Sequence, residues 1–204
     1  MISGVKTRRA EAGRRLALLL ALLLGLALAA PAWALDLDTV TGWLAQRKGG
    51  QARFTEERFV SGFEGPLRAS GTLSFTAPER FARITTEPYP ESMVVDGNQL
   101  ILKRGGRSRQ MAVDAVPELA VLIEAVRGTL TGNAVTLDKH FKIGVEGSTT
   151  LWTLTLVPRD ARLATQVREI RIAGVASDVR SIELWLAGGD RSVMSIGPLQ
   201  SPLP

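Results

Sequence analysis

The sequence contains no cysteine and only one histidine among its 204 residues. Without cysteine the chain cannot form disulfides, thiolate metal sites or a Cys-His catalytic pair, so packing and hydrogen bonding must hold the fold. A zinc or iron site usually needs several imidazole ligands, and a Ser-His-Asp triad could be built only on His140. This residue lies between Lys139 and Phe141 on a predicted strand, and we interpret it as a solvated strand residue.

Other catalytic signatures are also missing. After residue 34 there is no Gly-x-Ser-x-Gly turn, Walker loop or dinucleotide-binding glycine run. Glu56 and Glu57 could form one half of a glycosidase carboxylate pair, but adjacent residues of a strand point to opposite faces. We interpret them as one exposed and one edge-facing acid. The sequence predicts neither an enzyme, nor a metal site, nor a cofactor.

The N-terminus of the sequence has the organisation of a secretory signal. Five lysines or arginines precede an apolar run over residues 16–30, which at about fifteen residues is too short to span a bilayer comfortably. Pro31 then breaks the helix, and residues 32–34 (Ala-Trp-Ala) give the small-x-small pattern of a cleavage site. We expect residues 1–34 to be a signal peptide, cleaved after Ala34, and the mature protein to be periplasmic. The alternative is an uncleaved anchor.

Most of the positive charge belongs to this segment. The chain has a formal net charge of +5, and residues 1–34, where five basic side chains face the single acid Glu11, contribute +4 of it. The remaining charge of about +1 gives no electrostatic reason to expect nucleic acid as a partner. Residues 35–204 are long enough for one domain with a substantial core.

The period of the apolar residues changes along this domain. Residues 35–47 predict a short amphipathic helix that Asp38 or Thr39 could cap. Two-residue alternation follows, clearest at residues 67–75, and marks strands with one face in water. Short turns between the strands favour antiparallel hairpins. The expected strands are residues 53–60, 67–75, 80–86, 92–95, 99–103, 139–145, 150–157, 167–173, 179–186 and 192–196, followed by a coil at 198–204.

One helix is expected to interrupt the strands at residues 114–128. Pro117 suits the first helical position, Glu118 complements the positive helix start, and Gly128 suits the exit. A single apolar stripe is formed by Leu119, Leu122, Ile123 and Val126. The strands make the predicted fold mainly β, and the two helices need an apolar surface to cover. The predicted fold is therefore a curved, incompletely closed antiparallel β-barrel lidded by helices. A solid core in place of a hollow interior is the alternative.

Four segments between residues 54 and 102 carry a family resemblance. They are residues 54–56 (Phe-Thr-Glu), 71–75 (Gly-Thr-Leu-Ser-Phe), 78–81 (Pro-Glu-Arg-Phe) and 91–100 (Glu-Ser-Met-Val-Val-Asp-Gly-Asn-Gln-Leu). Their order and spacing resemble the periplasmic LolA-like outer-membrane lipoprotein carriers. The usual family run is Phe-Thr-Gln, then Gly-x-Leu-x-x-x-x-Pro-x-x-Phe, then Val-x-Asp-Gly-x-x-Leu. The resemblance covers about fifty residues and thins after residue 130.

This resemblance implies a monomeric carrier without a cofactor. Its concave apolar face would hold the acyl chains of a lipoprotein, received from an inner-membrane transporter and passed to an outer-membrane receptor. At roughly 0.8 kcal/mol per methylene, burial of a sixteen-carbon chain is worth about 12 kcal/mol, and apolar linings supply such burial without directional bonds. The candidate lining residues are Leu73, Phe75, Phe81, Met93, Val95, Leu100, Trp152, Leu154 and Leu156 on strands, with Trp43, Leu44, Leu119, Leu122 and Ile123 on helices.

Two positions depart from the family pattern. The arginine that usually precedes the proline and hydrogen-bonds to the lid is Ala77 here, which should weaken lid closure. The aromatic residue expected two positions after Phe81 is Arg83. Both departures favour a divergent relative with another lipid-like cargo, such as a polyene or glycolipid. The alternatives are a protein-interaction or sensor module that uses the same sheet without a lipid cavity, and a hydrolase that would depend on His140 or a carboxylate pair.

Overall fold

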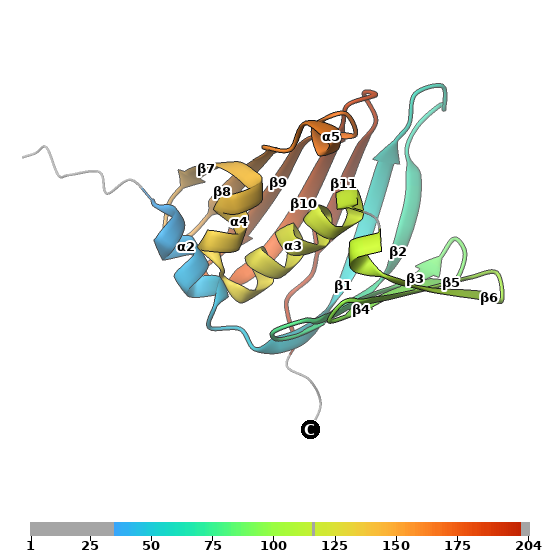
Figure 1. Ribbon diagram of the computed structural model, residues 1–204, viewed down its shortest axis with the longest axis horizontal. Coiled ribbons are helices and arrows are strands. Elements are labelled where there is room, and N and C mark those ends of the chain that lie inside the picture. Colours follow the sequence, from blue (N-terminus) through green and yellow to red (C-terminus); the bar gives the residue numbers. More distant parts are fainter. Residues whose placement is uncertain (1–34, 116, 201–204) are drawn as a thin grey trace, which may run out of the picture. The chain divides into compact units, whose positions relative to one another are not determined.

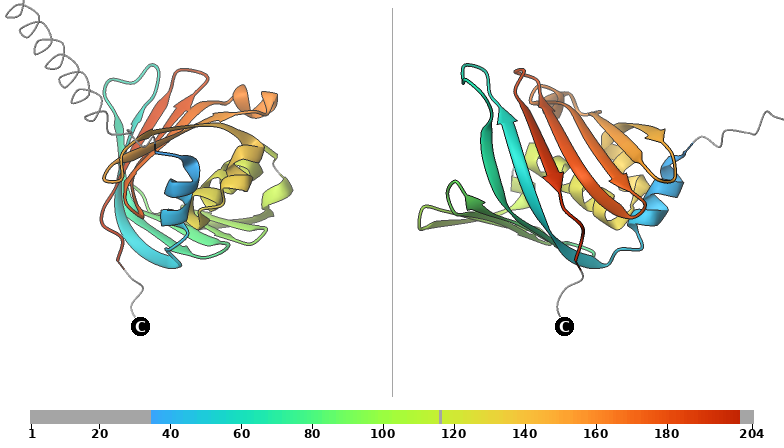
Figure 2. Two further views of the ribbon diagram at one scale, coloured as in Figure 1. Left: turned by 90° about the vertical axis from the view of Figure 1, so that its left-hand side faces the viewer. Right: turned by 180° about the vertical axis from the view of Figure 1, so that it is seen from behind.

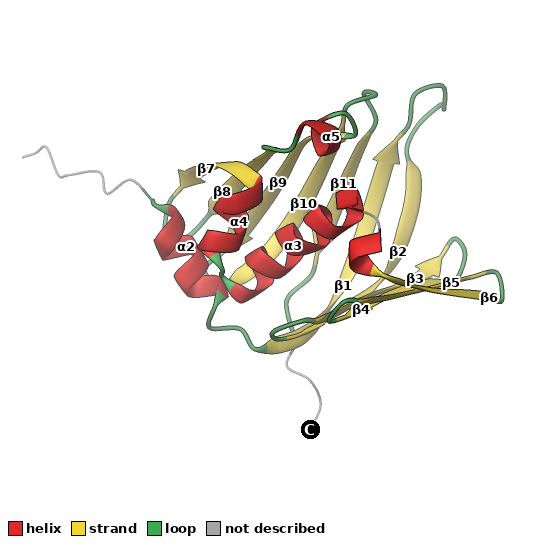
Figure 3. Ribbon diagram, viewed as in Figure 1, coloured by secondary structure: helices red, strands yellow, loops and turns green. Residues whose placement is uncertain are grey.

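The computed structural model describes residues 35–115 and 117–200, and the predicted signal segment lies outside these ranges. Within them the strands form one antiparallel sheet, in the order β6-β5-β4-β3-β2-β1-β11-β10-β9-β8-β7 (Figures 1 and 3). Two meanders are therefore joined where the first strand pairs with the last. The strands are β1 (Gly49–Phe59), β2 (Leu67–Thr76), β3 (Arg80–Glu87), β4 (Glu91–Asp96), β5 (Gln99–Arg104), β6 (Arg107–Ala112), β7 (Phe141–Gly147), β8 (Trp152–Pro158), β9 (Val167–Val175), β10 (Asp178–Leu186) and β11 (Arg191–Ile196).

Helices occupy the concave side of this sheet. Figure 2 shows the sheet curving around α3 and α4, with α2 next to them. The sheet order ends at β6 and β7, so the barrel is not closed, and α3 and α4 connect these two edges. The helices are α2 (Leu37–Leu44), α3 (Pro117–Thr131), α4 (Ala134–His140) and α5 (Ala161–Ala164), with a 3-10 turn at Val113–Ala115. The predicted fold class, a curved and incompletely closed antiparallel barrel with helices, is confirmed.

Strand alternation determines which side chains face the helices. On β1, Ala52, Phe54 and Glu56 are buried, whereas the residues between them are exposed. In the register of β1 with its two neighbours, Phe54 lies beside Gly71 of β2 and opposite Ile196 of β11. The inward face can therefore be followed from strand to strand across the whole sheet.

The buried apolar side chains form two clusters. The first, here the Trp152 cluster, contains Val40, Leu44, Ala125, Leu137, Phe141, Trp152, Leu154, Leu156, Leu163, Val167, Ile170 and Ile172. The second, the Phe81 cluster, contains Phe75, Phe81, Val95, Leu100, Val113 and Ile123. Helix α3 contributes to both: the predicted single stripe is divided, because Leu119, Ile123 and Val126 pack on the Phe81 cluster and Leu122 on the Trp152 cluster.

The helical segments after residue 115 differ from prediction in two places. Helix α3 continues past Gly128, where a Cβ would come within 2.9 Å of the Leu137 side chain of α4, and the chain turns at Gly132 with φ of +67°. His140 ends α4 and does not lie on a strand, since the Asn133 side chain accepts from the Thr136 N–H at 3.0 Å and starts a helix there.

The two ends of the domain also hold differences from prediction. Helix α2 is capped by Asp36, which accepts from the Thr39 N–H at 2.7 Å, and not by Asp38 or Thr39. In the predicted C-terminal coil, Gln200 pairs with Gln51 of β1 through backbone hydrogen bonds of 2.8 and 2.9 Å. The last described residues therefore extend the sheet contacts beyond β11.

Candidate functional site on the concave face

The structure divides the predicted lining residues between the two clusters. Phe75, Phe81, Val95, Leu100 and Ile123 are buried in the Phe81 cluster, with Met93 and Leu119 packed against it. Leu44, Trp152, Leu154 and Leu156 are buried in the Trp152 cluster, with Trp43 and Leu122 packed against it. Leu73 faces inward outside both clusters and is half-buried. Nine of these residues are thus core in this conformation, and their contact with a cargo stays a prediction.

Between the two clusters lies a central band of inward-facing side chains. It is formed by Glu56 and Arg58 of β1, Ala69 and Leu73 of β2, and Ser192 and Met194 of β11. Ala69, Leu73, Ser192 and Met194 are half-buried and Arg58 is exposed, so solvent reaches this part of the concave face. The central band mixes apolar and charged groups, in contrast to the clusters on either side.

A charged network occupies the central band. The Glu56 side chain is only 6% exposed, and its Oε1 accepts from Ser192 Oγ at 2.6 Å and from Arg58 Nε at 3.3 Å. Its Oε2 accepts from Arg83, which reaches over from β3. The Arg83 guanidinium carbon lies 4.9 Å from the centroid of the Phe54 ring, a cation–π distance. The network therefore joins three strands on the inner face.

Gly71 makes this contact across the sheet possible. It lies between Phe54 and Thr85 in the register of β1, β2 and β3, and it has no side chain to stand between Arg83 and Glu56. A Cβ at this position would collide with the carbonyl oxygen of Ile84. The backbones of β2 and β3 approach closely here, next to an irregularity between Ser70 and Gly71, which is where glycine is required.

The network carries more donors than acceptors. Two guanidinium groups surround one carboxylate, so its formal charge is +1. Both carboxylate oxygens already accept hydrogen bonds, whereas the buried Arg83 Nε has no acceptor among the described residues. A buried donor without a partner is costly, and although this nitrogen is itself shielded from solvent, the Arg83 side chain as a whole keeps 22% exposure on the inner face.

Sequence reasoning missed this network. The prediction that Glu56 and Glu57 lie on opposite faces is confirmed, because Glu57 pairs on the outer side with Arg68 at 2.9 Å. Treating the inward acid as edge-facing was wrong, since Glu56 is buried. A signal was present: Glu56 stands at the usual glutamine of the family run and Arg83 at the usual aromatic, and the two departures have opposite charges.

A polar contact ties α3 to the sheet even though Ala77 has replaced the usual arginine. Arg127 of α3 donates one hydrogen bond to the carbonyl oxygen of Gly97, in the β4–β5 turn, and another to Glu124 Oε1 at 2.8 Å. Its side chain is 18% exposed. The covering helix thus reaches the sheet with an arginine of its own, while Ala77 packs against the Phe81 cluster.

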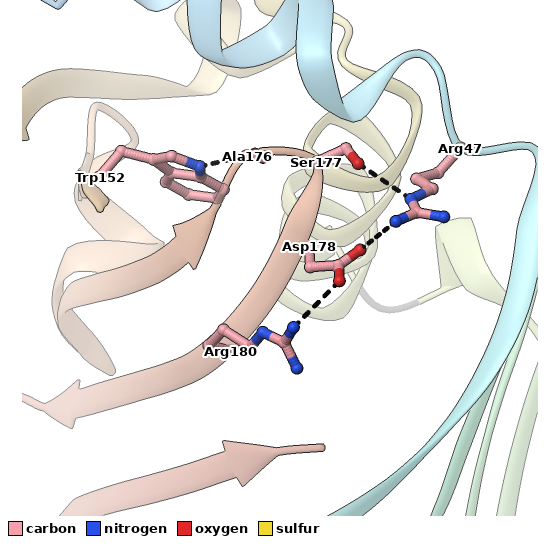
Figure 4. A network of polar contacts seen from close by, with 6 residues as sticks. All are labelled: Arg47, Trp152, Ala176, Ser177, Asp178 and Arg180. Atoms are coloured by element: carbon pink, nitrogen blue, oxygen red, sulfur yellow. Dashed lines mark hydrogen bonds and ion pairs between the residues drawn. The ribbon is translucent and has the colours of Figure 1, made fainter. Parts of the chain in front are cut away.

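The opposite end of the domain is held by a second polar network, shown in Figure 4. Arg47, which follows α2, donates to Asp178 at 2.6 Å and to Ser177 at 3.0 Å in the β9–β10 turn. Trp152 Nε1 donates to the carbonyl oxygen of Ala176 in the same turn at 2.8 Å. These bonds fix α2 and the largest buried side chain to one turn.

Two open pockets on the described residues lie outside the two apolar clusters. The larger of two shallow pockets, about 670 Å³, is lined mainly by outward-facing residues such as Thr55, Ser70 and Ser195. Among the described residues no helix is long and apolar enough to cross a membrane. No cluster of three or more His, Asp or Glu side chains that could hold a metal ion occurs within these same ranges.

Comparison with known proteins identifies the class of the protein. The family described as "Outer membrane lipoprotein carrier protein LolA-like" matches residues 29–197. The match spans most of the chain, which therefore belongs to this family. The chain is also 37% identical over 68 residues to an outer-membrane lipoprotein carrier protein of Methylibium petroleiphilum, an alignment that spans only 32% of each protein.

Solved structures are similar in arrangement but distant in sequence. A LolA superfamily protein from Nitrosomonas europaea has 9% identity and a TM-score of 0.44, with 84% of this chain and 96% of that chain covered. Lipoprotein LppX of Mycobacterium tuberculosis has 8% identity and a TM-score of 0.44, with 82% and 97% covered.

Proposed function

We propose that this protein is a periplasmic carrier that shields the acyl chains of a lipoprotein or other lipid-like cargo and moves it towards the outer membrane. The observation that carries the proposal is the concave face: it is apolar at both ends, half-open in the central band and covered by α3. Family membership over residues 29–197 supports the same reading. The inner-membrane transporter, the outer-membrane receptor and the monomeric state are part of the proposal.

Space for acyl chains would be made by displacing α3. This helix brings about half a dozen large apolar side chains to the two clusters, and full burial of each is worth about 1.5–3 kcal/mol. Only Ile123 among them is fully buried and the others are half-buried, so exposing them would cost about 5–10 kcal/mol, whereas burying a sixteen-carbon chain would return about 12 kcal/mol. Because the two quantities are similar, cargo can replace the helix on the sheet without being held irreversibly.

Two measurements test the carrier proposal. Native mass spectrometry of protein purified from membranes should show retained lipid, and a fluorescent fatty-acid probe should bind the purified protein. Leu122→Glu and Phe81→Glu should abolish probe binding, because each places a charge without a partner on the apolar surface. Val135→Glu is the matched control, since Val135 lies on α4 with 80% exposure.

Three results would contradict the carrier proposal. One is a wild-type protein that neither retains lipid nor binds the probe. Another is full probe binding by both glutamate variants. The third is an equal loss of binding in the Val135→Glu control. Circular dichroism of each variant shows whether a loss of binding reflects a loss of fold.

A further inference from the structure

The charged network of the central band lies next to the apolar clusters. An amphiphile whose acyl chain lay on one of these clusters would have its head group near the network. In the sheet register Arg83 stands between Leu73 and Met93, and Glu56 stands between Ala69 and Met194. Polar groups are therefore flanked by apolar side chains along both directions of the inner face. A molecule that places its acyl chain on either cluster would bring its polar end to this network.

The free hydrogen-bonding capacity of the network is that of a donor. Glu56 accepts from Arg58, Arg83 and Ser192, whereas Arg83 has an unpartnered buried Nε and a side chain that is 22% exposed. Arginine presents a planar fork that matches phosphate and carboxylate oxygens. A cationic head group would be repelled by the two guanidinium groups, and the Glu56 carboxylate that could attract it already accepts hydrogen bonds from Arg58, Arg83 and Ser192.

We infer that the Glu56–Arg83 pair is a head-group site that makes this carrier prefer acyl compounds with an oxyanion, a phosphate or a carboxylate, over neutral ones of the same chain length. Arg83 is the contacting group, and Glu56 positions it by holding one guanidinium nitrogen. The inference rests on the proposed carrier function. It adds a chemical selection that an apolar lining alone cannot provide, since apolar contacts do not distinguish head groups.

A role limited to stability is a weaker explanation of the pair. A buried ion pair contributes little beyond what apolar side chains of similar volume would provide, because both ions lose their hydration. Stability alone also gives no reason for a net positive charge on the inner face.

The test compares two probes that differ only in the head group. Binding of dodecyl phosphate and of dodecanol to the full mature chain is measured by titration calorimetry and by native mass spectrometry. The wild-type protein should bind dodecyl phosphate at least tenfold more tightly. Arg83→Met should remove this preference and leave dodecanol binding within about twofold. Binding of laurate, which carries a carboxylate on a chain of similar length, shows whether the site accepts either oxyanion.

Two further variants make the result independent of folding. Glu56→Gln/Arg83→Met removes both charges, so no lone carboxylate is left buried, and it should also lose the preference. Arg68→Met is the matched control, because Arg68 pairs with Glu57 at 2.9 Å on the outer face of the same sheet. This control should keep the wild-type preference.

The outcomes separate the two proposals. Equal binding of both probes by the wild type, or a preference that survives in the double variant, overturns the head-group site and leaves the carrier function standing. A wild-type protein that binds neither dodecyl phosphate nor dodecanol overturns both. A preference that disappears equally in Arg68→Met overturns the assignment to the inner face.

Discussion

The Trp152 cluster and the Phe81 cluster lie on the same concave face but differ in how completely their side chains are buried and in which elements cover them. In the first, Phe141, Trp152, Leu154 and Leu156 are completely buried, and α2, α4 and α5 each bring a buried side chain to it. In the second, Phe75 and Phe81 keep 7% and 8% exposure, and the buried side chains that cover them come only from α3 and the 3-10 turn. The difference suggests a fixed half of the barrel and an adaptable half.

Polar contacts hold the covering elements in place at both clusters. Around the Trp152 cluster, Arg47 and the Trp152 indole bind one turn through several hydrogen bonds. Around the Phe81 cluster, Arg127 binds the sheet through the carbonyl of Gly97. The 3-10 turn over this cluster is also tied to the β4–β5 turn, because the Val113 N–H donates to the Asn98 carbonyl oxygen at 2.8 Å and Asn98 and Asp114 are joined by hydrogen bonds of 3.0 and 3.3 Å. The contrast between the two clusters therefore lies in how completely their side chains are buried and not in the number of polar contacts.

The largest effect is expected where the packing is densest. Trp152→Ala should lower the free energy of unfolding by about 4–5 kcal/mol, since it leaves a large cavity and an unpaired Ala176 carbonyl. Phe81→Ala should cost about 3 kcal/mol, because its half-buried neighbours can relax into the space. Urea denaturation of both variants measures the difference. An equal or greater loss at Phe81 would contradict the contrast between the clusters.

The junction between α2 and α3 should be the next most sensitive point. Gly132 has φ of +67°, and a Cβ there would meet the carbonyl oxygen of Thr41. Gly132→Ala should therefore cost about 2–3 kcal/mol, from backbone strain and from displacement of α2. Gly42→Ala is the matched control, because Gly42 lies inside α2 with open space around it. This control should gain about 0.5–1 kcal/mol in the same thermal or urea unfolding experiment.

Loosening the lid should have a smaller effect on stability and a larger one on exchange. Arg127→Met keeps the length of the side chain but removes the hydrogen bonds to Gly97 and Glu124, and should cost about 1–2 kcal/mol. Because α3 then loses its hydrogen bond to the β4–β5 turn, probe association measured by stopped-flow fluorescence should accelerate. Glu124→Gln keeps the contact with Gly97 and should leave the rate nearly unchanged. A slower rate in Arg127→Met would argue against α3 as the moving element.

The smallest effect concerns the start of α2 beside the Trp152 cluster. Hydrogen bonds from the Thr39 side chain and backbone lower the pKa of the Asp36 carboxyl group below its ordinary value. The carboxylate therefore stabilises the fold above the pH at which unfolded aspartate titrates, and this contribution is lost as the pH falls through the lowered pKa. Asp36→Ala should lower the thermal midpoint slightly at pH 7, and the difference from the wild type should shrink in acid. A difference that grows in acid would contradict the assigned cap.

Elements with a clear apolar rhythm were predictable, and those without one were not. The alternation of residues 67–75 predicted β2, whose residues 69–74 are all half-buried and whose Phe75 is buried. Helix α4 was missed because Leu137 is its one fully buried residue, which gives no helical period. Strand β6 was not recognised because it is an edge strand with nearly every residue exposed. Burial on one face produces the sequence signal, and elements without such burial leave none.

The candidate site was predictable only in part. The apolar lining residues were identified as a set, because period and family order mark the inward face. Their division into two clusters was not, since it depends on how α3 lies between the two halves of the sheet. The charged network was missed as well, because its contacts join residues 27 and 136 positions apart in the chain.

The sequence by itself determined that this is a curved antiparallel barrel of the LolA-like family with an apolar inner face, because strand period, turn residues and motif order are local properties of the chain. Only the tertiary structure decided that Glu56 and Arg83 meet on that inner face and that α3 bridges two unequal clusters. The physical reason is that sheet register and helix placement are set by long-range packing, and no local pattern encodes which distant side chains that packing brings together.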